Sequence, residues 1–231
     1  MRPALARFVL KLSGLPSLEP VRVDTVMEGL LERAADRLIA GDPAAITEAP
    51  VSRVDFLRWL SEHRAVLFHG SGRDDLALLE PIRLSRDATE FGDQQAVFAT
   101  SDPVWAIYFA VLQRHRPFGT RNGSLGVADT GIYPRWYHFS VERHLDRATR
   151  FGPGWLYVVP RAPFSLEPPL RGVFDTAQWV SPEPITPLAR IAITPDDFPF
   201  LDAVVTHRAR DPWAFVYART VARNLQRSAR R

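Results

Sequence analysis

The sequence contains no cysteine and only one lysine, Lys11, among its 29 basic residues. The absence of cysteine excludes a disulfide framework, a thiolate zinc site and a cysteine nucleophile. No window approaches 18 uncharged apolar residues, which argues against a transmembrane helix. In the stretch 1–18, Arg7 and Lys11 interrupt the apolar residues before they reach the length of a signal peptide. We therefore expect a soluble, cytoplasmic protein with no membrane partner.

Several motifs of common enzymes are also missing. The single lysine lies outside any glycine-rich turn, so there is no P-loop. The Gly-x-Gly pairs at 70–72 and 152–154 lack the third glycine of a dinucleotide-binding fingerprint. Neither Gly-x-Ser-x-Gly nor His-Glu-x-x-His occurs, and the six histidines show no metal-ligand spacing. We therefore expect no metal cofactor.

What is present is a globular composition rich in arginine. Hydrophobic residues make up 46% of the 231 residues, with fourteen Phe and six Trp, which is enough for a packed core. The net charge is only +3, but its positive part is almost entirely arginine, which binds phosphates and carboxylates in bidentate geometry. This composition fits an anionic ligand or a nucleic acid partner, and fits equally well a codon bias without functional meaning.

Helical patterns precede and follow the central part of the chain. Residues 23–40 carry apolar side chains at helical spacing. A second helix is expected from Ser52, which forms a capping pattern with Asp55. Residues 211–231 again have a helical apolar stripe, with arginines near the end that oppose the helix dipole. We therefore predict a helical extension packed on the core over 1–61, a main domain over 62–200 and a basic C-terminal helix over 201–231.

Short strands are expected in the main domain, because segments rich in Val, Ile, Phe, Tyr and Trp alternate with turn residues. They cover 65–70, 95–100, 135–141, 154–160, 177–181 and 189–194. A helix capped by Ser101 or Asp102, with Pro103 in its first turn, is apolar on nearly all sides and should be buried. The glycine-rich segment 115–134 predicts a long surface loop. This pattern indicates the α+β class.

Polar residues stand out at three places in this pattern. His69-Gly70-Ser71 ends an apolar strand, where an imidazole can bond a sugar hydroxyl and a glycine lets a ligand approach the backbone. At the start of the buried helix, Thr100 offers a hydroxyl, and exposed amides there would suit a phosphate. Tyr108, two turns into that helix, could line a cleft and stack on a heteroaromatic ring. Each feature alone also has an ordinary structural explanation.

The third place is a late strand that begins at Gln178 and continues into a proline-rich stretch. Gln178 and Glu183 are its polar candidates, and either side chain could hold a ribose hydroxyl.

In this order, "LFHGS", "VFATSDPVWAIYFA" and "QWVSPEP" resemble the ADP-ribosyltransferase superfamily over residues 62–200. That superfamily includes the diphtheria-toxin and poly(ADP-ribose) polymerase group, rifampin ADP-ribosyltransferases and RNA 2′-phosphotransferases, and its pattern is abbreviated His, Tyr, Glu. The resemblance implies a split, mixed or antiparallel β-sheet core with N-terminal helices and a C-terminal helix. It also implies that NAD is a substrate and that nicotinamide is released.

The resemblance assigns roles to individual residues. His69 would bind the adenine-side ribose, and the backbone of Gly70, beside Ser71, would bind the nicotinamide carboxamide. Phe98, or its neighbour Val97, stands where the family often has a strand tyrosine. Tyr108 falls on the position that stacks on nicotinamide, while Trp105 stands where a serine is expected.

Gln178 departs from the pattern, because it falls where the catalytic glutamate would lie. A carboxylate stabilises the oxocarbenium-like ribose and can deprotonate the acceptor, whereas glutamine supplies neither charge nor basicity. Glu183, five residues later, or Asp175 in the preceding loop could supply the carboxylate instead.

The sequence therefore predicts an NAD-dependent ADP-ribosyltransferase whose acceptor is a protein, a nucleic acid or a small molecule. Two alternatives stay open. One is an RNA 2′-phosphotransferase, which would use arginines such as Arg73, Arg83 and Arg86 around the phosphate. The other is a catalytically degenerate module that binds NAD, ADP-ribose or nucleic acid without turnover.

Overall fold

The computed structural model describes residues 2–81, 91–113, 119–143 and 147–229. Its helices are α1 (Pro3–Leu12), α2 (Thr25–Ile39), α3 (Ala45–Glu48), α4 (Arg53–His63), α5 (Pro103–Val111), α6 (Arg147–Arg150) and α7 (Trp213–Ser228), with 3-10 turns at Pro195–Asp197 and Leu201–Ala203. Its strands are β1 (Ser17–Leu18), β2 (Val66–Ser71), β3 (Val97–Thr100), β4 (Thr120–Val127), β5 (Arg135–Glu142), β6 (Gly154–Pro160), β7 (Ser165–Leu166), β8 (Phe174–Asp175), β9 (Gln178–Ser181), β10 (Ala189–Ile193) and β11 (Val205–His207).

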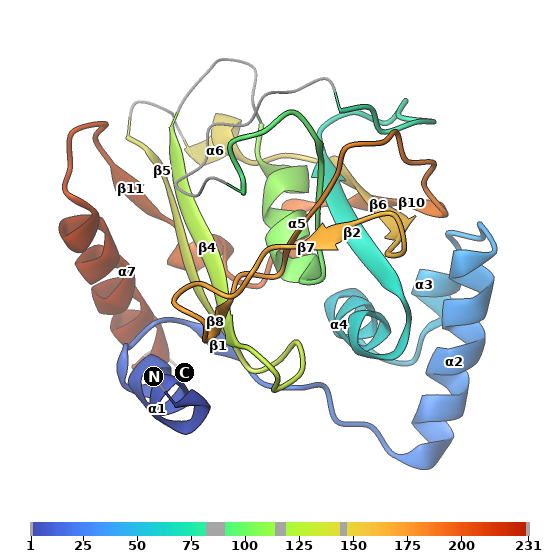
Figure 1. Ribbon diagram of the computed structural model, residues 1–231, viewed down its shortest axis with the longest axis horizontal. Helices are drawn as coiled ribbons and strands as arrows, with labels where there is room; N and C mark the ends of the chain where they lie inside the picture. Colours follow the sequence, from blue (N-terminus) through green and yellow to red (C-terminus); the bar gives the residue numbers. More distant parts are fainter. Residues whose placement is uncertain (1, 82–90, 114–118, 144–146, 230–231) are drawn as a thin grey trace.

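The strands form two sheets with helix α5 between them (Figure 1). The six-stranded sheet has the order β10-β6-β2-β3-β9-β7, and every neighbouring pair in it is antiparallel. The five-stranded sheet has the order β1-β5-β4-β8, and β11 pairs with β5 in parallel. The α+β class predicted from the sequence is confirmed.

Helix α5 is buried because the six-stranded sheet lets it approach very closely. A Cβ atom added at Gly70 would lie 1.9 Å from the carbonyl oxygen of Ala106, and one at Gly154 would lie 1.8 Å from that of Ala110. No side chain but hydrogen fits at either position, so the two glycines allow the helix backbone to rest on β2 and β6. The predicted burial of this helix is confirmed.

The helix starts follow the predicted capping chemistry. The Ser52 side chain accepts a hydrogen bond from the backbone N–H of Asp55 at the start of α4. At the start of α5, the Asp102 carboxylate accepts one from Val104, and Pro103 occupies the first turn. These bonds satisfy backbone donors that have no partner inside the helix.

The prediction of a surface loop over 115–134 is wrong for its middle part. Residues Thr120–Val127 form β4, which pairs with β5 in antiparallel register. The glycines of this segment suggested a loop, but Gly126 lies within β4, where the missing side chain leaves room for a neighbouring one. A Cβ atom there would lie 3.0 Å from a guanidinium nitrogen of Arg135. Residues 115–118 lie outside the described residues.

The N-terminal segment 1–61 contributes a strand as well as helices. β1 pairs with β5, placing Ser17 opposite Trp136. Leu31 and Phe56 belong to the same buried cluster as the side chains of α5. The two ends of the chain lie together, with α1 beside α7 (Figure 1), and the Asn224 side chain donates to the carbonyl of Gly14. Within the described residues, none of the helices combines the length and apolar character needed to cross a membrane.

Candidate functional site

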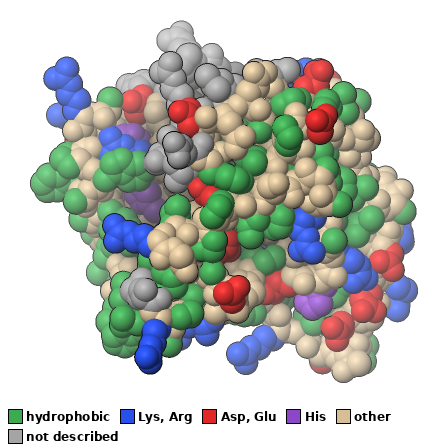
Figure 2. Space-filling view, viewed as in Figure 1, with side chains coloured by type: hydrophobic (Ala, Val, Ile, Leu, Met, Phe, Trp, Pro, Cys, Tyr) green, Lys and Arg blue, Asp and Glu red, His purple; other side chains and the backbone are tan. Residues whose placement is uncertain are grey.

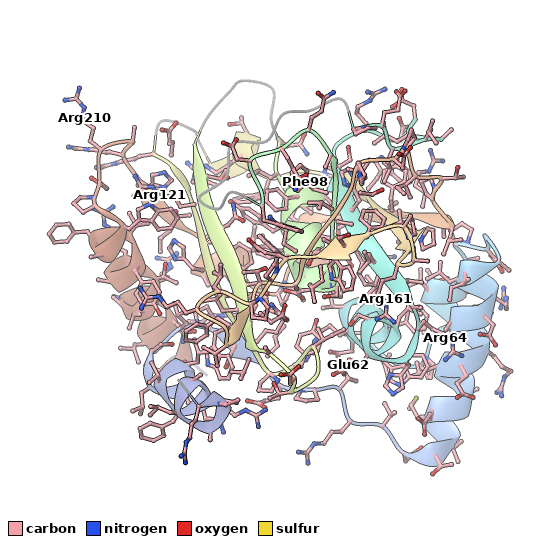
Figure 3. All side chains as sticks on the ribbon, in the orientation of Figure 1. Glu62, Arg64, Phe98, Arg121, Arg161 and Arg210 are labelled. Atoms are coloured by element: carbon pink, nitrogen blue, oxygen red, sulfur yellow. The ribbon has the colours of Figure 1, made fainter. Side chains whose placement is uncertain are left out.

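Strands β2, β3 and β9 are neighbours, so the strands that carry His69, Thr100 and Gln178 lie side by side. The register places Phe68 opposite Thr100 and Thr100 opposite Gln178. Residues far apart in the chain therefore form one row across three strands. Phe98 lies two residues before Thr100 on β3 and is labelled in Figure 3.

The ladder between β2 and β3 ends immediately after this row. Among the described residues, Phe68 and Thr100 form the one registered pair between these strands, whereas β2 pairs with β6 along its whole length. The next residue, His69, places its imidazole Nδ1 2.7 Å from the carbonyl oxygen of Phe98. A side chain thus bonds this carbonyl at the point where the two backbones separate.

The alternation of backbone hydrogen bonds shows which groups border this opening. The backbone N–H of Arg161 donates to the carbonyl of Ala65. Ala65 and every second residue after it on β2 therefore direct their N–H and C=O groups toward β6. In an antiparallel strand the direction alternates from residue to residue, so the N–H and C=O groups of Gly70 point toward β3. Gly70 and Phe98 would be the next pair but are not in register contact. The opening between β2 and β3 is therefore lined by backbone polar groups.

His69 is half-buried and has a defined tautomer. Because a carbonyl oxygen only accepts, Nδ1 carries the hydrogen in its bond to Phe98, and in the neutral ring Nε2 is an acceptor. The ring lies beside that of Tyr157, with a centroid separation of 6.4 Å. Ser71 is also half-buried, and its hydroxyl accepts from the backbone N–H of Arg73. The strand end therefore offers an oriented imidazole and a hydroxyl held in a local turn.

Tyr108 does not line a cleft as the sequence suggested. Its side chain is fully buried, packs against Phe139 and Phe198, and directs its hydroxyl toward the carbonyl of Ser140 at 3.4 Å. The physical reason is that α5 lies between two sheets, so this side of the helix faces the five-stranded sheet. A ring without exposed surface is not positioned to stack on nicotinamide.

The half-buried aromatic residues of α5 are Trp105 and Phe109, which the sequence reading did not select. They lie one turn apart, with ring centroids 6.2 Å from each other, and Trp105 Nε1 donates to Asn122 Oδ1 at 2.6 Å. Their i, i+4 spacing was a usable signal, but a helix apolar on nearly all sides does not show which stripe is exposed.

The start of α5 is not arranged to hold a phosphate. Thr100 and Ser101 are buried, and the Thr100 hydroxyl accepts from the backbone N–H of Asp102. The Asp102 carboxylate caps the helix and is itself fully buried. An anion already occupies the positive end of the helix, so a phosphate there would be repelled.

Asp102 belongs to a buried network that connects the two sheets. Its carboxylate accepts hydrogen bonds from Ser124 Oγ at 2.6 Å, Tyr133 at 3.0 Å and Tyr137 at 3.2 Å. Burial raises the pKa of both phenols well above the ordinary value, and the charge of Asp102 raises it further. Both tyrosines therefore remain hydrogen-bond donors at any ordinary pH.

Arg135 completes this network and holds the segment before Gln178. Its guanidinium is fully buried, donates to Ser124 Oγ at 2.7 Å and pairs with Asp175 at 2.7 Å. Asp175 in turn accepts from the backbone N–H of Ala177. Asp175 therefore has a structural role in positioning β9 and is not oriented as a substitute for the missing glutamate.

Gln178 and Glu183 lie at opposite ends of β9. Gln178 is buried and begins the strand in the row with Thr100. Glu183 is exposed beyond the other end, where its backbone N–H bonds the hydroxyl of Ser181. The structure brings Gln178, and not Glu183, into the row that continues to β2.

Arg73, one of the arginines suggested for RNA binding, forms an exposed ion pair with Asp75. Arg83 and Arg86 lie outside the described residues. In the described part of the chain, no three His, Asp or Glu side chains converge as metal ligands would.

Two hollows, of about 870 Å³ and 560 Å³, lie elsewhere on the surface, and no residue of β2, β3 or β9 lines either one. Neither hollow contains the predicted residues, so the candidate site rests on the hydrogen-bonding geometry at the point where β2 and β3 separate. Comparison of the chain with protein-family models, with curated proteins and with solved structures finds no match.

Proposed function

We propose that the protein binds NAD at the opening between β2 and β3 and transfers ADP-ribose to an acceptor. The bond between the ribose C1′ and the nicotinamide nitrogen breaks, and nicotinamide leaves with the bonding electron pair. A bond from C1′ to the acceptor forms, and the acceptor proton passes to solvent. The observation that supports this proposal most is the early end of the β2–β3 ladder at His69 and Gly70.

The groups at the opening match the polar groups of NAD. A carboxamide has one acceptor and two donors, and the backbone of Gly70 offers one donor and one acceptor directed toward β3. The imidazole of His69 is fixed by Phe98 and suits a ribose hydroxyl. Trp105 and Phe109 offer half-buried rings on α5 in place of Tyr108. We assign these rings to the contact with the nicotinamide ring.

The rate of ADP-ribose transfer that we expect depends on Gln178. Its carboxamide can bond a ribose hydroxyl, but it cannot neutralise the positive charge that develops on the ribose or accept the proton of the acceptor. Transfer should therefore be slow and should favour acceptors that are nucleophilic without a base. The same residue favours a second function, in which the protein binds NAD or ADP-ribose without turnover.

The release of nicotinamide from NAD tests the proposal. The wild-type protein should release nicotinamide, and His69→Ala should reduce the rate at least tenfold because the ribose contact is lost. His63→Ala is the matched control, because His63 is exposed and stacks on Trp59. Equal release by the parent and His69→Ala would contradict the assignment of the site.

Thermal unfolding separates the two functions. NAD at one hundred times its dissociation constant should stabilise the folded protein by about 2.7 kcal/mol. Stabilisation without nicotinamide release would identify the binding module. The absence of both stabilisation and release would refute both functions.

A further inference from the structure

The hollow of about 870 Å³ lies between β11, α7, α6 and the residues that precede β11. Five arginines line it: Arg143, Arg150, Arg208, Arg219 and Arg223. Asp211 is the one acidic residue among the described residues that line it. Arg and His side chains also lie at the upper left of the face seen in Figure 2, where Figure 3 labels Arg121 and Arg210, two arginines that do not line the hollow. We call this hollow, defined by its lining residues, the arginine hollow.

Two of these arginines are placed side by side by the parallel pairing of β5 and β11. His207 lies opposite Glu142, so Arg208 and Arg143 follow the ends of two adjacent strands. Like charges at neighbouring positions destabilise a sheet edge. Within the described residues, neither guanidinium has a hydrogen-bonding or ion-pair partner. The fold therefore holds two cations close together, while Asp211, the one carboxylate among the described lining residues, forms its ion pair with Arg219.

Two more arginines come from one face of α7 and are held in fixed orientations. Arg219 pairs with Asp211 at 2.7 Å and donates to the carbonyl of Thr206 at 3.0 Å. Arg223, one turn later, donates through Nε to the carbonyl of Asp202 at 2.9 Å. Each guanidinium has five N–H donors, so most of them are not used in these bonds.

The remaining wall of the arginine hollow is also ordered. Arg150 on α6 is only 6% exposed, so its side chain is packed into the wall of the hollow. Burial lowers the pKa of His207, which keeps its ring neutral near pH 7. Arg121, a residue of β4 that is labelled in Figure 3, donates to the carbonyls of Ala209 and Asp211 and so fixes the turn that follows Arg208.

We propose that the arginine hollow binds a small molecule that carries two or more linked phosphate groups. Guanidinium groups bind phosphate oxygens in bidentate pairs, and several on one concave surface match several linked phosphates. The volume is that of a small-molecule site. A single-stranded nucleic acid would need aromatic platforms for its bases, and Phe151 is the one aromatic residue among the lining residues described. This proposal does not depend on the proposed function, because the two sites share no residue.

Calorimetric titration with inorganic triphosphate at constant ionic strength tests this proposal. Triphosphate should bind at least tenfold more tightly than orthophosphate, because linked phosphates engage several arginines at once. The double variant Arg143→Gln/Arg208→Gln should weaken triphosphate binding at least tenfold. The matched control Arg22→Gln/Arg33→Gln removes two exposed arginines near the N-terminus and should change the affinity less than twofold.

Three results would overturn the proposal. One is unchanged affinity in the Arg143/Arg208 double variant. Another is a single-stranded RNA oligomer that binds more tightly than triphosphate and loses binding in the same variant, which would identify a nucleic-acid surface. The third is a loss of triphosphate binding in His69→Ala, which would place the probe at the NAD opening. A protein that failed to release nicotinamide could still bind triphosphate at the arginine hollow, so the two proposals are tested separately.

Discussion

At the scale of single residues, Gln178 is the position where the proposed chemistry and the sequence disagree. It occupies the row with Thr100 and Phe68, one strand away from the opening that His69 borders. Gln178→Glu should therefore increase nicotinamide release at least tenfold, because a carboxylate would stabilise the developing ribose cation. Release should be measured near pH 8, since burial raises the pKa of a carboxyl group. Gln178→Ala is the control and should not exceed the parent; an equally slow Gln178→Glu variant would contradict the role assigned to this position.

Arg135 is the residue on which the buried network depends. Arg135→Ala would leave Asp102 and Asp175 without their cation in the interior, which should lower the free energy of unfolding by about 3–5 kcal/mol. Urea denaturation measures this loss. Arg22→Ala removes an exposed arginine and should change stability by less than about 0.5 kcal/mol. A loss below about 1 kcal/mol in Arg135→Ala would show that the network contributes little.

At the scale of elements, Gly70 connects the packing of α5 with the opening. Gly70→Ala should destabilise the protein by about 3 kcal/mol or more, because its Cβ would collide with the backbone of Ala106. Gly72→Ala is the matched control, since no atom lies within 4 Å of a Cβ there. Denaturant unfolding of the two variants makes the comparison. If they were equally stable, the close contact between β2 and α5 would be refuted.

The attachment of α7 to β5 should depend on pH. Burial, together with the charges of the neighbouring His207 and Arg121, lowers the pKa of His138 to about 4. The unfolded chain, with a histidine pKa near 6.5, binds a proton that the folded protein excludes. Stability should therefore be complete above pH 6.5 and fall by at most about 3 kcal/mol as the pH approaches 4.

His138→Gln isolates this contribution, because glutamine can still bond the hydroxyl of Thr220, which His138 contacts at 2.7 Å. The pH dependence of unfolding between 6.5 and 4 should be shallower in the variant than in the parent. The lowered pKa of His207 accounts for a part of the slope that remains. Identical slopes would show that His138 is protonated equally in both states.

The sequence predicted the elements whose signals are local. Strands β2, β6 and β10 are rich in Val, Ile, Leu and aromatic residues, and the caps of α4 and α5 depend on side chains within three residues. It did not predict β4, because Gly126 is required by the distant Arg135. It misplaced Tyr108, because an all-apolar helix does not reveal which side faces which sheet. The end of the β2–β3 ladder depends on how the two strands are aligned, and the sequence of a single strand does not determine that alignment.

At the scale of the whole molecule, two sheets enclose α5, and each sheet carries one proposed site on a different part of the surface. Within the six-stranded sheet, β2 and β3 separate at His69, where NAD is proposed to bind. Residues of β11 in the five-stranded sheet line the arginine hollow. The two sites should respond independently in hydrogen exchange. NAD should slow exchange at the first site, and linked phosphates should slow it at the second.

Hydrogen exchange with and without saturating NAD tests whether NAD binds at the opening between β2 and β3. The amide of Gly70, which points toward β3 without a ladder partner, should exchange at least tenfold more slowly with NAD. Residues 97–100 should also be protected, while residues 213–228 of α7 should not change. Unchanged exchange at residues 66–71 and 97–100 under saturating NAD, or protection confined to α7 and β11, would contradict NAD binding at this opening.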